Sequence, residues 1–135
     1  MPQPKVFIFA PADTESHKEL EDAGCLLALG SANWNNPTGD TTEKLAEMAS
    51  SADALAGTSI KGARISREVL QASEGLRIVA KYTVGVDEID VDAATELGIL
   101  VTHAPTEANW GGVAETTVTK LLTLLKNTRE RDRHM

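Results

Sequence analysis

The sequence lacks the features that define several large classes of protein. One cysteine, Cys25, stands among 135 residues, so no intramolecular disulfide can form. No apolar run approaches the roughly 20 residues that a membrane-spanning helix requires. Acidic residues outnumber basic ones by 20 to 13, and the net charge of −7 disfavours binding to nucleic acid or anionic membranes. We therefore expect neither a nucleic-acid partner nor a membrane partner.

Targeting and cofactor signatures are also scarce. The first ten residues lack the charged region, apolar region and cleavage pattern of a signal peptide. The absence of a cysteine framework suits a reducing compartment, so we expect a cytoplasmic protein. None of the ten glycines falls into the G-x-G-x-x-G pattern that binds dinucleotides. Hydrophobic residues make up 41% of the chain, which is typical of one ordinary globular domain.

Short apolar runs alternate with amphipathic segments along the chain. This alternation predicts a parallel α/β sheet with right-handed crossovers. We expect a flavodoxin-like three-layer sandwich with a five-stranded parallel sheet, followed by a long helix that leaves this domain. The predicted strands are residues 5–10, 25–29, 54–60, 77–82 and 99–102, of which 5–10 and 25–29 are interpreted as buried. The predicted helices are residues 14–23, 42–50, 66–72, 91–97 and 112–128.

The stretch from Leu76 to Glu115 carries the strongest functional signal. Its two loops, residues 83–87 and 103–112, follow predicted strands, and ligands of parallel sheets bind at the carboxyl ends of strands. Successive backbone N–H groups around Val84 and Gly85 can form a cavity that binds an anion. Spacing alone also fits, and favours, an ordinary turn in which Asp87 caps the next helix.

The same stretch resembles the amino-terminal part of the D-isomer-specific 2-hydroxyacid dehydrogenase family, particularly its D-3-phosphoglycerate dehydrogenase branch. The matching motifs are V-G-V-D at Val84–Asp87, I-D at Ile89-Asp90, A-A-T-E-L-G-I at Ala93–Ile99, A-P at Ala104-Pro105 and V-A-E at Val113–Glu115. Residues 5–75 match the family in layout more than in identity. The resemblance implies that the backbone amides of Val84 and Gly85 bind the carboxylate of a small 2-hydroxy or 2-oxo acid.

The resemblance also implies two domains. Residues 1–107 would form the substrate-binding (catalytic) domain. Residues 108–135 would form a hinge at Asn109, Gly111 and Gly112, and the helix that crosses to a Rossmann domain. Val113 would lie near the nicotinamide of the cofactor, and the long C-terminal helix region would join two copies into a homodimer.

The chain departs from the family pattern where hydride chemistry would begin. The dinucleotide fingerprint and the family's catalytic Arg, Glu and His would follow residue 135. The resemblance therefore implies NAD or NADP in the full-length protein, no cofactor bound by this chain, no catalytic residue within it, and no activity of the chain alone. The alternative is a stand-alone flavodoxin-like module that binds or regulates without catalysis, because fold does not fix function.

Several polar residues near these loops have two interpretations. Lys61 follows the third predicted strand and would bind the substrate carboxylate or phosphate, or would simply be solvated. Glu88 would oppose an anion if it pointed inward. His103 is interpreted as structural rather than as a general base, and His17 as solvated. The acidic residues between 87 and 92 are interpreted as the start of a helix, with no metal site.

Overall fold

The computed structural model describes residues 3–12, 15–33, 35–127, 130 and 132–133. The chain separates into two compact units, Met1–Ala104 and Pro105–Met135. The first unit holds a five-stranded parallel sheet in the order β2-β1-β3-β4-β5, which is the flavodoxin-like order. This confirms the predicted fold class. The strands are β1 Lys5–Ala10, β2 Leu26–Leu29, β3 Ala54–Gly57, β4 Ile78–Lys81 and β5 Leu100–Thr102.

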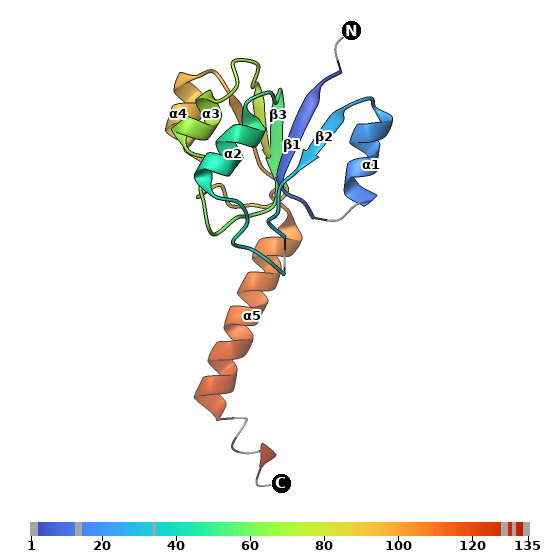
Figure 1. Ribbon diagram of the computed structural model, residues 1–135. Helices are drawn as coiled ribbons and strands as arrows, with labels where there is room; N and C mark the ends of the chain where they lie inside the picture. The colour runs from blue at the N-terminus through green and yellow to red at the C-terminus, as the bar shows by residue number, and fades with distance from the viewer. Residues whose placement is uncertain (1–2, 13–14, 34, 128–129, 131, 134–135) are drawn as a thin grey trace. The chain divides into compact units, whose positions relative to one another are not determined.

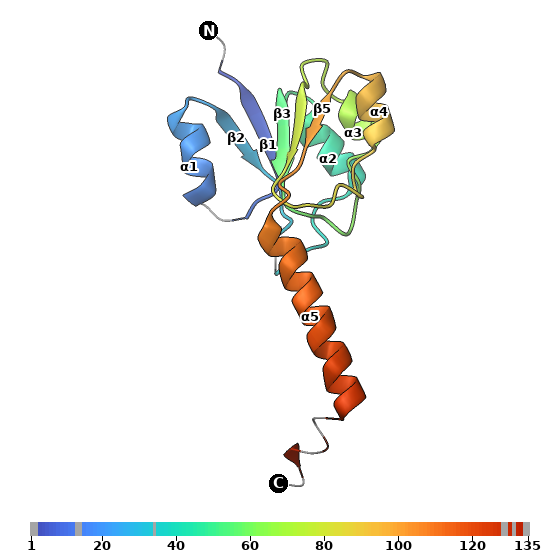
Figure 2. The ribbon, with the colours of Figure 1, turned by 180° about the vertical axis from the view of Figure 1, so that it is seen from behind.

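Helices cover the two faces of this sheet unequally. They are α1 Glu15–Asp22, α2 Thr42–Ala49, α3 Arg67–Gln71 and α4 Val91–Glu96. In Figures 1 and 2, α2, α3 and α4 lie on one face and α1 lies on the other. The larger cluster of buried side chains accordingly lies under α2, α3 and α4 and includes Phe7, Phe9, Leu45, Leu55, Val69 and Val79. The smaller cluster on the other face contains Val6, Ile8 and Ala56.

Local signals set the ends of several helices. The Thr41 side chain accepts a hydrogen bond from the Lys44 backbone N–H and caps α2, where the sequence favours either Thr41 or Thr42 as the cap. Asp90 caps α4 by accepting from the Ala93 backbone N–H at 2.9 Å, so the alternative of a cap at Asp87 is wrong. Gly98 follows α4 with a φ of +70°, a conformation that favours glycine and ends the helix. Residue 14, where the first helix was predicted to begin, lies outside the described residues.

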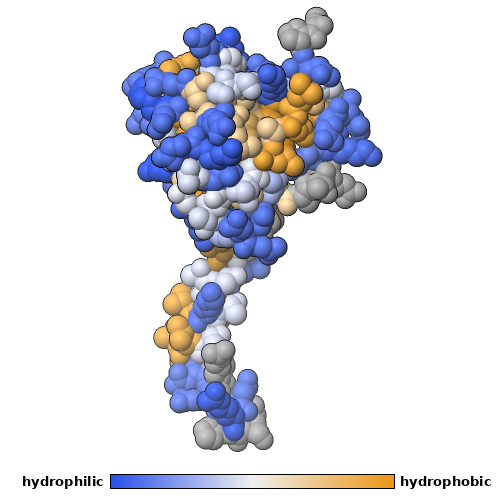
Figure 3. Space-filling model, in the orientation of Figure 1, coloured by the Kyte–Doolittle hydropathy of each residue, from blue (hydrophilic) through white to orange (hydrophobic). Residues whose placement is uncertain are grey.

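The prediction that residues 25–29 form a buried strand is wrong. β2 is an edge strand, and Leu26 and Leu29 are each about half exposed. An apolar groove of about 140 Å³ runs between β2 and α2, with Phe7 and Met48 among its lining residues. Figure 3 shows these apolar atoms gathered on that face. Hydrophobicity alone cannot distinguish an edge strand from a central one, because both carry apolar runs.

The second unit contains one long helix, α5, from Glu107 to Lys126. Its N-cap is Thr106, so the predicted start at Gly112 is wrong by five residues. Pro105 explains the observed start. Its ring disfavours the helical conformation of the residue before it, and it has no N–H to donate within a helix, so α5 begins after Pro105. Asn127 ends α5 in the left-handed conformation, which asparagine tolerates. None of the described helices is long and apolar enough to cross a membrane.

His17 and Tyr82 pack together on the α1 face. Only 4% of His17 is exposed, its ring centroid lies 6.3 Å from that of Tyr82, and its Nε2 has no partner among the described residues. The prediction that His17 is solvated is therefore wrong. The charged neighbours in the sequence suggested a surface position, but α1 turns this one side chain toward the sheet.

Tyr82 gives a test of this packing, because it is the single tyrosine of the chain. Burial raises its pKa above the ordinary value of about 10. When the pKa of a group is higher in the folded state, its neutral form stabilises the fold at any pH below the pKa of the unfolded state. That stabilisation is lost as the pH rises through the pKa of the folded state. We expect the phenolate absorbance to appear at higher pH in the folded chain than in the urea-unfolded chain. Coincident midpoints, with circular dichroism still native, would contradict the packing.

Candidate functional site

The loops that follow β2, β3, β4 and β5 meet at the carboxyl edge of the sheet. The Lys61 backbone N–H, after β3, donates to the Pro37 carbonyl in the loop after β2 at 2.8 Å. The Ala104 backbone N–H, after β5, donates to the Thr83 carbonyl after β4 at 3.1 Å. These bonds hold neighbouring loops together, as the topology of a parallel sheet requires.

The most unusual of these loops is residues 83–88, which we call the amide loop. Among the described residues, no backbone N–H of the amide loop donates to a protein acceptor. Every one of its carbonyls, in contrast, accepts a hydrogen bond. The donors to these six carbonyls, in order, are the Ala104 N–H, His103 Nδ1, Thr83 Oγ1, the Ile89 N–H, Arg64 Nη2 and the Ile65 N–H.

This one-sided pairing has a simple geometric consequence. In a planar trans peptide the C=O and the following N–H point in opposite directions. A carbonyl fixed by a donor on the protein side therefore turns the next N–H away from that donor. The amide loop presents successive unpaired N–H groups, with Val84 half-buried and Gly85 exposed. Such a run binds anions, and most readily a carboxylate or phosphate.

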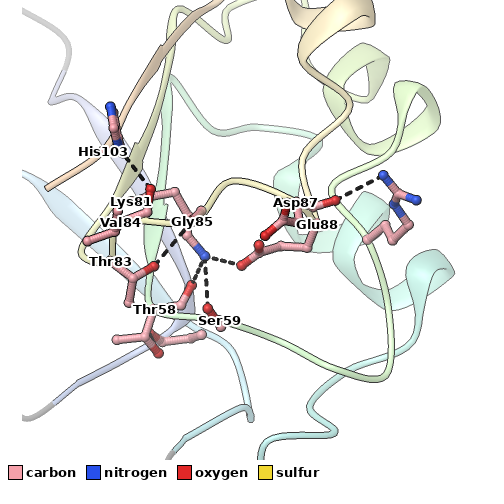
Figure 4. Close-up of polar contacts among 11 residues, drawn as sticks. Thr58, Ser59, Lys81, Thr83, Val84, Gly85, Asp87, Glu88 and His103 are labelled. Atoms are coloured by element: carbon pink, nitrogen blue, oxygen red, sulfur yellow. Dashed lines mark hydrogen bonds and ion pairs between the residues drawn. The ribbon is translucent and has the colours of Figure 1, made fainter. Parts of the chain in front are cut away.

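His103 is one of the groups that fix this loop. Its Nδ1 lies 2.9 Å from the Val84 carbonyl oxygen (Figure 4). Because a carbonyl only accepts, Nδ1 must carry the proton in this contact. The ring thus orients the Val84–Gly85 peptide, which agrees with the structural interpretation of His103.

A buried lysine at the base of the loop was missed by the sequence analysis. The Lys81 side chain is fully buried, and its Nζ donates to the Thr58 carbonyl at 2.5 Å and lies 3.4 Å from Ser59 Oγ. It also forms an ion pair with Glu88, whose side chain is 12% exposed. Figure 4 shows these contacts converging on one ammonium group. Glu88 points inward, and its negative charge is balanced by Lys81.

Lys61 borders a separate small pocket at the same edge of the sheet. The pocket has a volume of about 160 Å³ and is lined by Asn33, Pro37, Thr58, Ser59 and Lys61. Thr58 and Ser59 also contact Lys81, which in turn contacts the end of the amide loop. The structure therefore brings Lys61, Val84 and Gly85 onto adjoining loops of one unit.

The predicted hinge and cofactor residues belong to the second unit. Asn109, Gly111, Gly112 and Val113 all lie inside the first two turns of α5 rather than before it. Val113 is 67% exposed, and a Cβ on Gly111 or Gly112 would meet no atom within 4 Å. Packing within the described chain therefore does not explain the two glycines, and the hinge stays a prediction.

The acidic residues between 87 and 92 have separate roles. Asp90 caps α4, and Glu88 is paired with Lys81. Within the described part of the chain, no three His, Cys, Asp or Glu side chains gather in a way that would hold a metal ion.

Comparison with known proteins places this geometry in context. The family model for the catalytic domain of D-isomer specific 2-hydroxyacid dehydrogenases matches residues 6–133. The chain is 36% identical over 123 residues to the D-3-phosphoglycerate dehydrogenase of Methanocaldococcus jannaschii, covering 91% of this chain and 21% of that protein. It is 37% identical over 103 residues to the glyoxylate reductase of Pyrococcus furiosus, covering 76% of this chain and 29% of that protein.

Solved structures agree with these matches. The crystal structure of a protein from Pyrococcus horikoshii OT3 superposes with a TM-score of 0.74 at 25% identity. The superposition covers 98% of this chain and 36% of that one. The chain thus spans about a fifth to two fifths of the length of these relatives.

Proposed function

We propose, because the chain belongs to the D-isomer specific 2-hydroxyacid dehydrogenase family, that it forms the substrate-binding part of an NAD(P)-dependent oxidoreductase. The proposed reaction interconverts a D-2-hydroxy acid and its 2-oxo acid. The single observation that carries the proposal is the amide loop, in which every carbonyl is paired and, among the described residues, every N–H lacks a protein acceptor.

The amide loop suits the one group that all these substrates share. A 2-hydroxy or 2-oxo acid carries a carboxylate next to the reacting carbon, and backbone N–H groups bind carboxylate oxygens through charge-assisted hydrogen bonds. Val84 and Gly85 are proposed to hold this carboxylate. Gly85 has no side chain to cover the N–H groups, and Lys81 offsets the charge of Glu88 nearby.

The pocket beside Lys61 is proposed to take the rest of the substrate. Lys61 is exposed and has no ion-pair partner within 4 Å among the described residues. Its ammonium is available to a second carboxylate or a phosphate on the substrate. This arrangement supports a substrate that has an acidic group at each end.

The cofactor of the proposed enzyme is NAD or NADP, but the residues of this chain do not fit a dinucleotide site. The sequence has no G-x-G-x-x-G pattern, and Gly111-Gly112 lies within α5 rather than at a strand-to-helix turn. Val113 offers only an apolar side chain toward a nicotinamide. We therefore assign no hydride-transfer step to these residues and propose that the chain alone is inactive.

The exposed apolar side of α5 is proposed to pair with the same helix of a second copy. Trp110, Val113, Leu121, Leu124 and Leu125 are each more than half exposed, and no residue of α5 is buried. These side chains recur at the helical period and form one stripe. An apolar stripe of this size indicates an interaction surface.

Carboxylate binding is the direct test of the amide loop. We expect 2-oxoglutarate to shift the Val84 and Gly85 amide signals of the ¹⁵N-labelled chain. We expect Gly85→Val to weaken binding about tenfold or more, since one charge-assisted hydrogen bond is worth about 1.5–3 kcal/mol. Nuclear magnetic resonance titration measures both effects.

Gly75→Val is the matched control for this experiment. A Cβ at Gly75 would lie 3.2 Å from a carboxylate oxygen of Asp53, and one at Gly85 would lie 3.1 Å from Asp87. Gly75 precedes β4, whereas Gly85 follows it, so Gly75→Val should leave the affinity unchanged. Equal losses in the two variants, or no shift at Val84 and Gly85 in the wild-type chain, would contradict the proposed site.

The division between binding and catalysis gives a second test. We expect the 135-residue chain to show no NADH- or NADPH-dependent reduction of glyoxylate, hydroxypyruvate or 2-oxoglutarate, measured by nicotinamide absorbance. A polypeptide extended through a following Rossmann segment should reduce at least one of them. Measurable turnover by this chain alone, or carboxylate binding without turnover in the extended protein, would favour a non-catalytic binding module.

If two copies pair through α5, the mass of the chain in solution should be that of a dimer, and a charge placed in the apolar stripe should reduce it to that of a monomer. We expect the chain to sediment as a dimer and Leu121→Glu to sediment as a monomer, because a carboxylate in an apolar interface is desolvated without a partner. Thr119→Glu places the same charge on the other side of α5 and should leave the dimer intact. A monomeric wild-type chain in analytical ultracentrifugation would refute the pairing.

A further inference from the structure

Lys81 and Glu88 stand at the two ends of the amide loop. Lys81 is the last residue of β4, and Glu88 is the last residue of the loop. Their ion pair therefore bridges a separation of seven residues and closes the loop at its base. The six N–H groups that find no protein acceptor within the described parts of the chain lie on the segment that this bridge closes.

The Lys81 ammonium has no hydrogen left for a ligand. An ammonium group has three N–H donors. Its three acceptors are the Thr58 carbonyl, Ser59 Oγ and Glu88. Its side chain is also fully buried, with Nζ 5.8 Å from the centre of the Phe9 ring. Lys81 therefore cannot contact a substrate directly, and whatever it contributes must act through its partners.

Those partners come from the two places where a substrate is proposed to bind. Thr58 and Ser59 line the pocket beside Lys61, and Glu88 ends the amide loop. One buried ammonium thus joins the wall of the pocket to the base of the loop. The Glu88 backbone is held as well, because its carbonyl accepts from the Ile65 N–H at 2.8 Å.

The charge of the pair matters as much as its shape. Without Lys81, the Glu88 carboxylate would be buried and unpaired, which is strongly unfavourable, and it would repel any anion on the nearby amides. With Lys81, the pair is neutral and adds no net charge at the base of the loop, although the Asp87 carboxylate, 3.1 Å from where a Cβ on Gly85 would lie, remains a negative charge on the loop.

We propose that Lys81 is a positioning residue that, paired with Glu88, clasps the amide loop and holds it rigid at a fixed separation from the pocket beside Lys61. The clasp selects ligands whose two acidic groups match that separation. Its effect on affinity rests on the proposed function, whereas its effect on the ligand-free loop does not.

The rigidity of the ligand-free loop is the first measurement. In the wild-type chain we expect ¹⁵N relaxation order parameters near about 0.85 for residues 83–88, as for rigid backbone. In Lys81→Met and in Glu88→Ala we expect them to fall below about 0.6, the range of flexible segments. A folded Lys81→Met chain whose amide loop stays as rigid as the wild type would overturn the proposal.

The ion pair between Arg67 and Glu96 supplies a matched control. It also joins two segments far apart in the sequence, with Arg67 Nη2 and Glu96 Oε2 separated by 2.6 Å. Both side chains are largely exposed, and the pair links α3 to α4 rather than the amide loop. Arg67→Met should leave the order parameters of residues 83–88 unchanged. A general loosening in this variant too would mean that loss of any ion pair mobilises the loop.

The affinity of the chain for 2-oxoglutarate is the second measurement. It distinguishes a failure of the proposed binding site from a failure of the proposed role of Lys81. Lys81→Met should bind 2-oxoglutarate at least tenfold more weakly and lose its preference for this diacid over pyruvate. If the wild-type chain binds neither acid, the proposed function fails, and the relaxation data still decide the clasp. If binding is intact in Lys81→Met, the clasp does not control the site.

A milder variant covers the possibility that Lys81→Met does not fold. Glu88→Gln keeps an oxygen that accepts from Lys81 and removes the charge. We expect it to fold and to give order parameters in residues 83–88 between those of the wild type and about 0.6. Wild-type rigidity in Glu88→Gln together with wild-type rigidity in Glu88→Ala would also overturn the proposal.

Discussion

The structure depends on the desolvated charge at the end of β4. Lys81 has no exposed side-chain surface, and burying an ammonium costs several kcal/mol unless it is paired and hydrogen-bonded. The fold meets that requirement with acceptors from two segments, Thr58 and Ser59 after β3 and Glu88 at the base of the amide loop, and both segments contact the end of β4 through Lys81. A neutral residue at position 81 would remove the cost, but it would also remove the ion pair that joins the end of β4 to the base of the amide loop.

At the same edge of the sheet, hydrogen bonds to the carbonyls of the amide loop decide which way its N–H groups point. Each carbonyl of the amide loop is paired to a donor on the protein side, and those donors come from four separate parts of the chain: Ile65 and its neighbour Arg64, Thr83, Ile89, and His103 with Ala104. Four of these donors reach the loop through tertiary contacts, whereas Thr83 Oγ1 and the Ile89 N–H are local contacts within a turn. Its free N–H groups are a consequence of where the carbonyls are held.

This origin explains what the sequence could and could not predict. The parallel sheet, its five strands and the cap at Thr41 follow from local patterns, and the structure confirms them. The exposure of β2 and the burial of His17 depend on tertiary packing, which local patterns do not show. The start of α5 at Glu107 depends on the cap at Thr106, which the sequence analysis did not select. Lys81 was missed because its sequence, Ala80-Lys81-Tyr82, gives no sign that a lysine ending a strand turns inward. The family resemblance predicts a binding role for Val84 and Gly85, and the hydrogen bonds of the neighbouring carbonyls explain why, among the described residues, their amides have no protein acceptor.

The composition of α5 extends this reasoning to the second unit. Two glycines and four threonines lie within its 20 residues, and together they cost roughly 4 kcal/mol of helix propensity relative to alanine. Thr117 and Thr123 donate to carbonyls one turn earlier, at 2.8 Å each, which satisfies their hydroxyls but does not stabilise the helix. An isolated helix of this length is marginal even with better residues, so most of its stability must come from packing of its apolar stripe. Since no residue of α5 is buried within its own unit, its exposed leucines define the side of the helix on which that packing would lie.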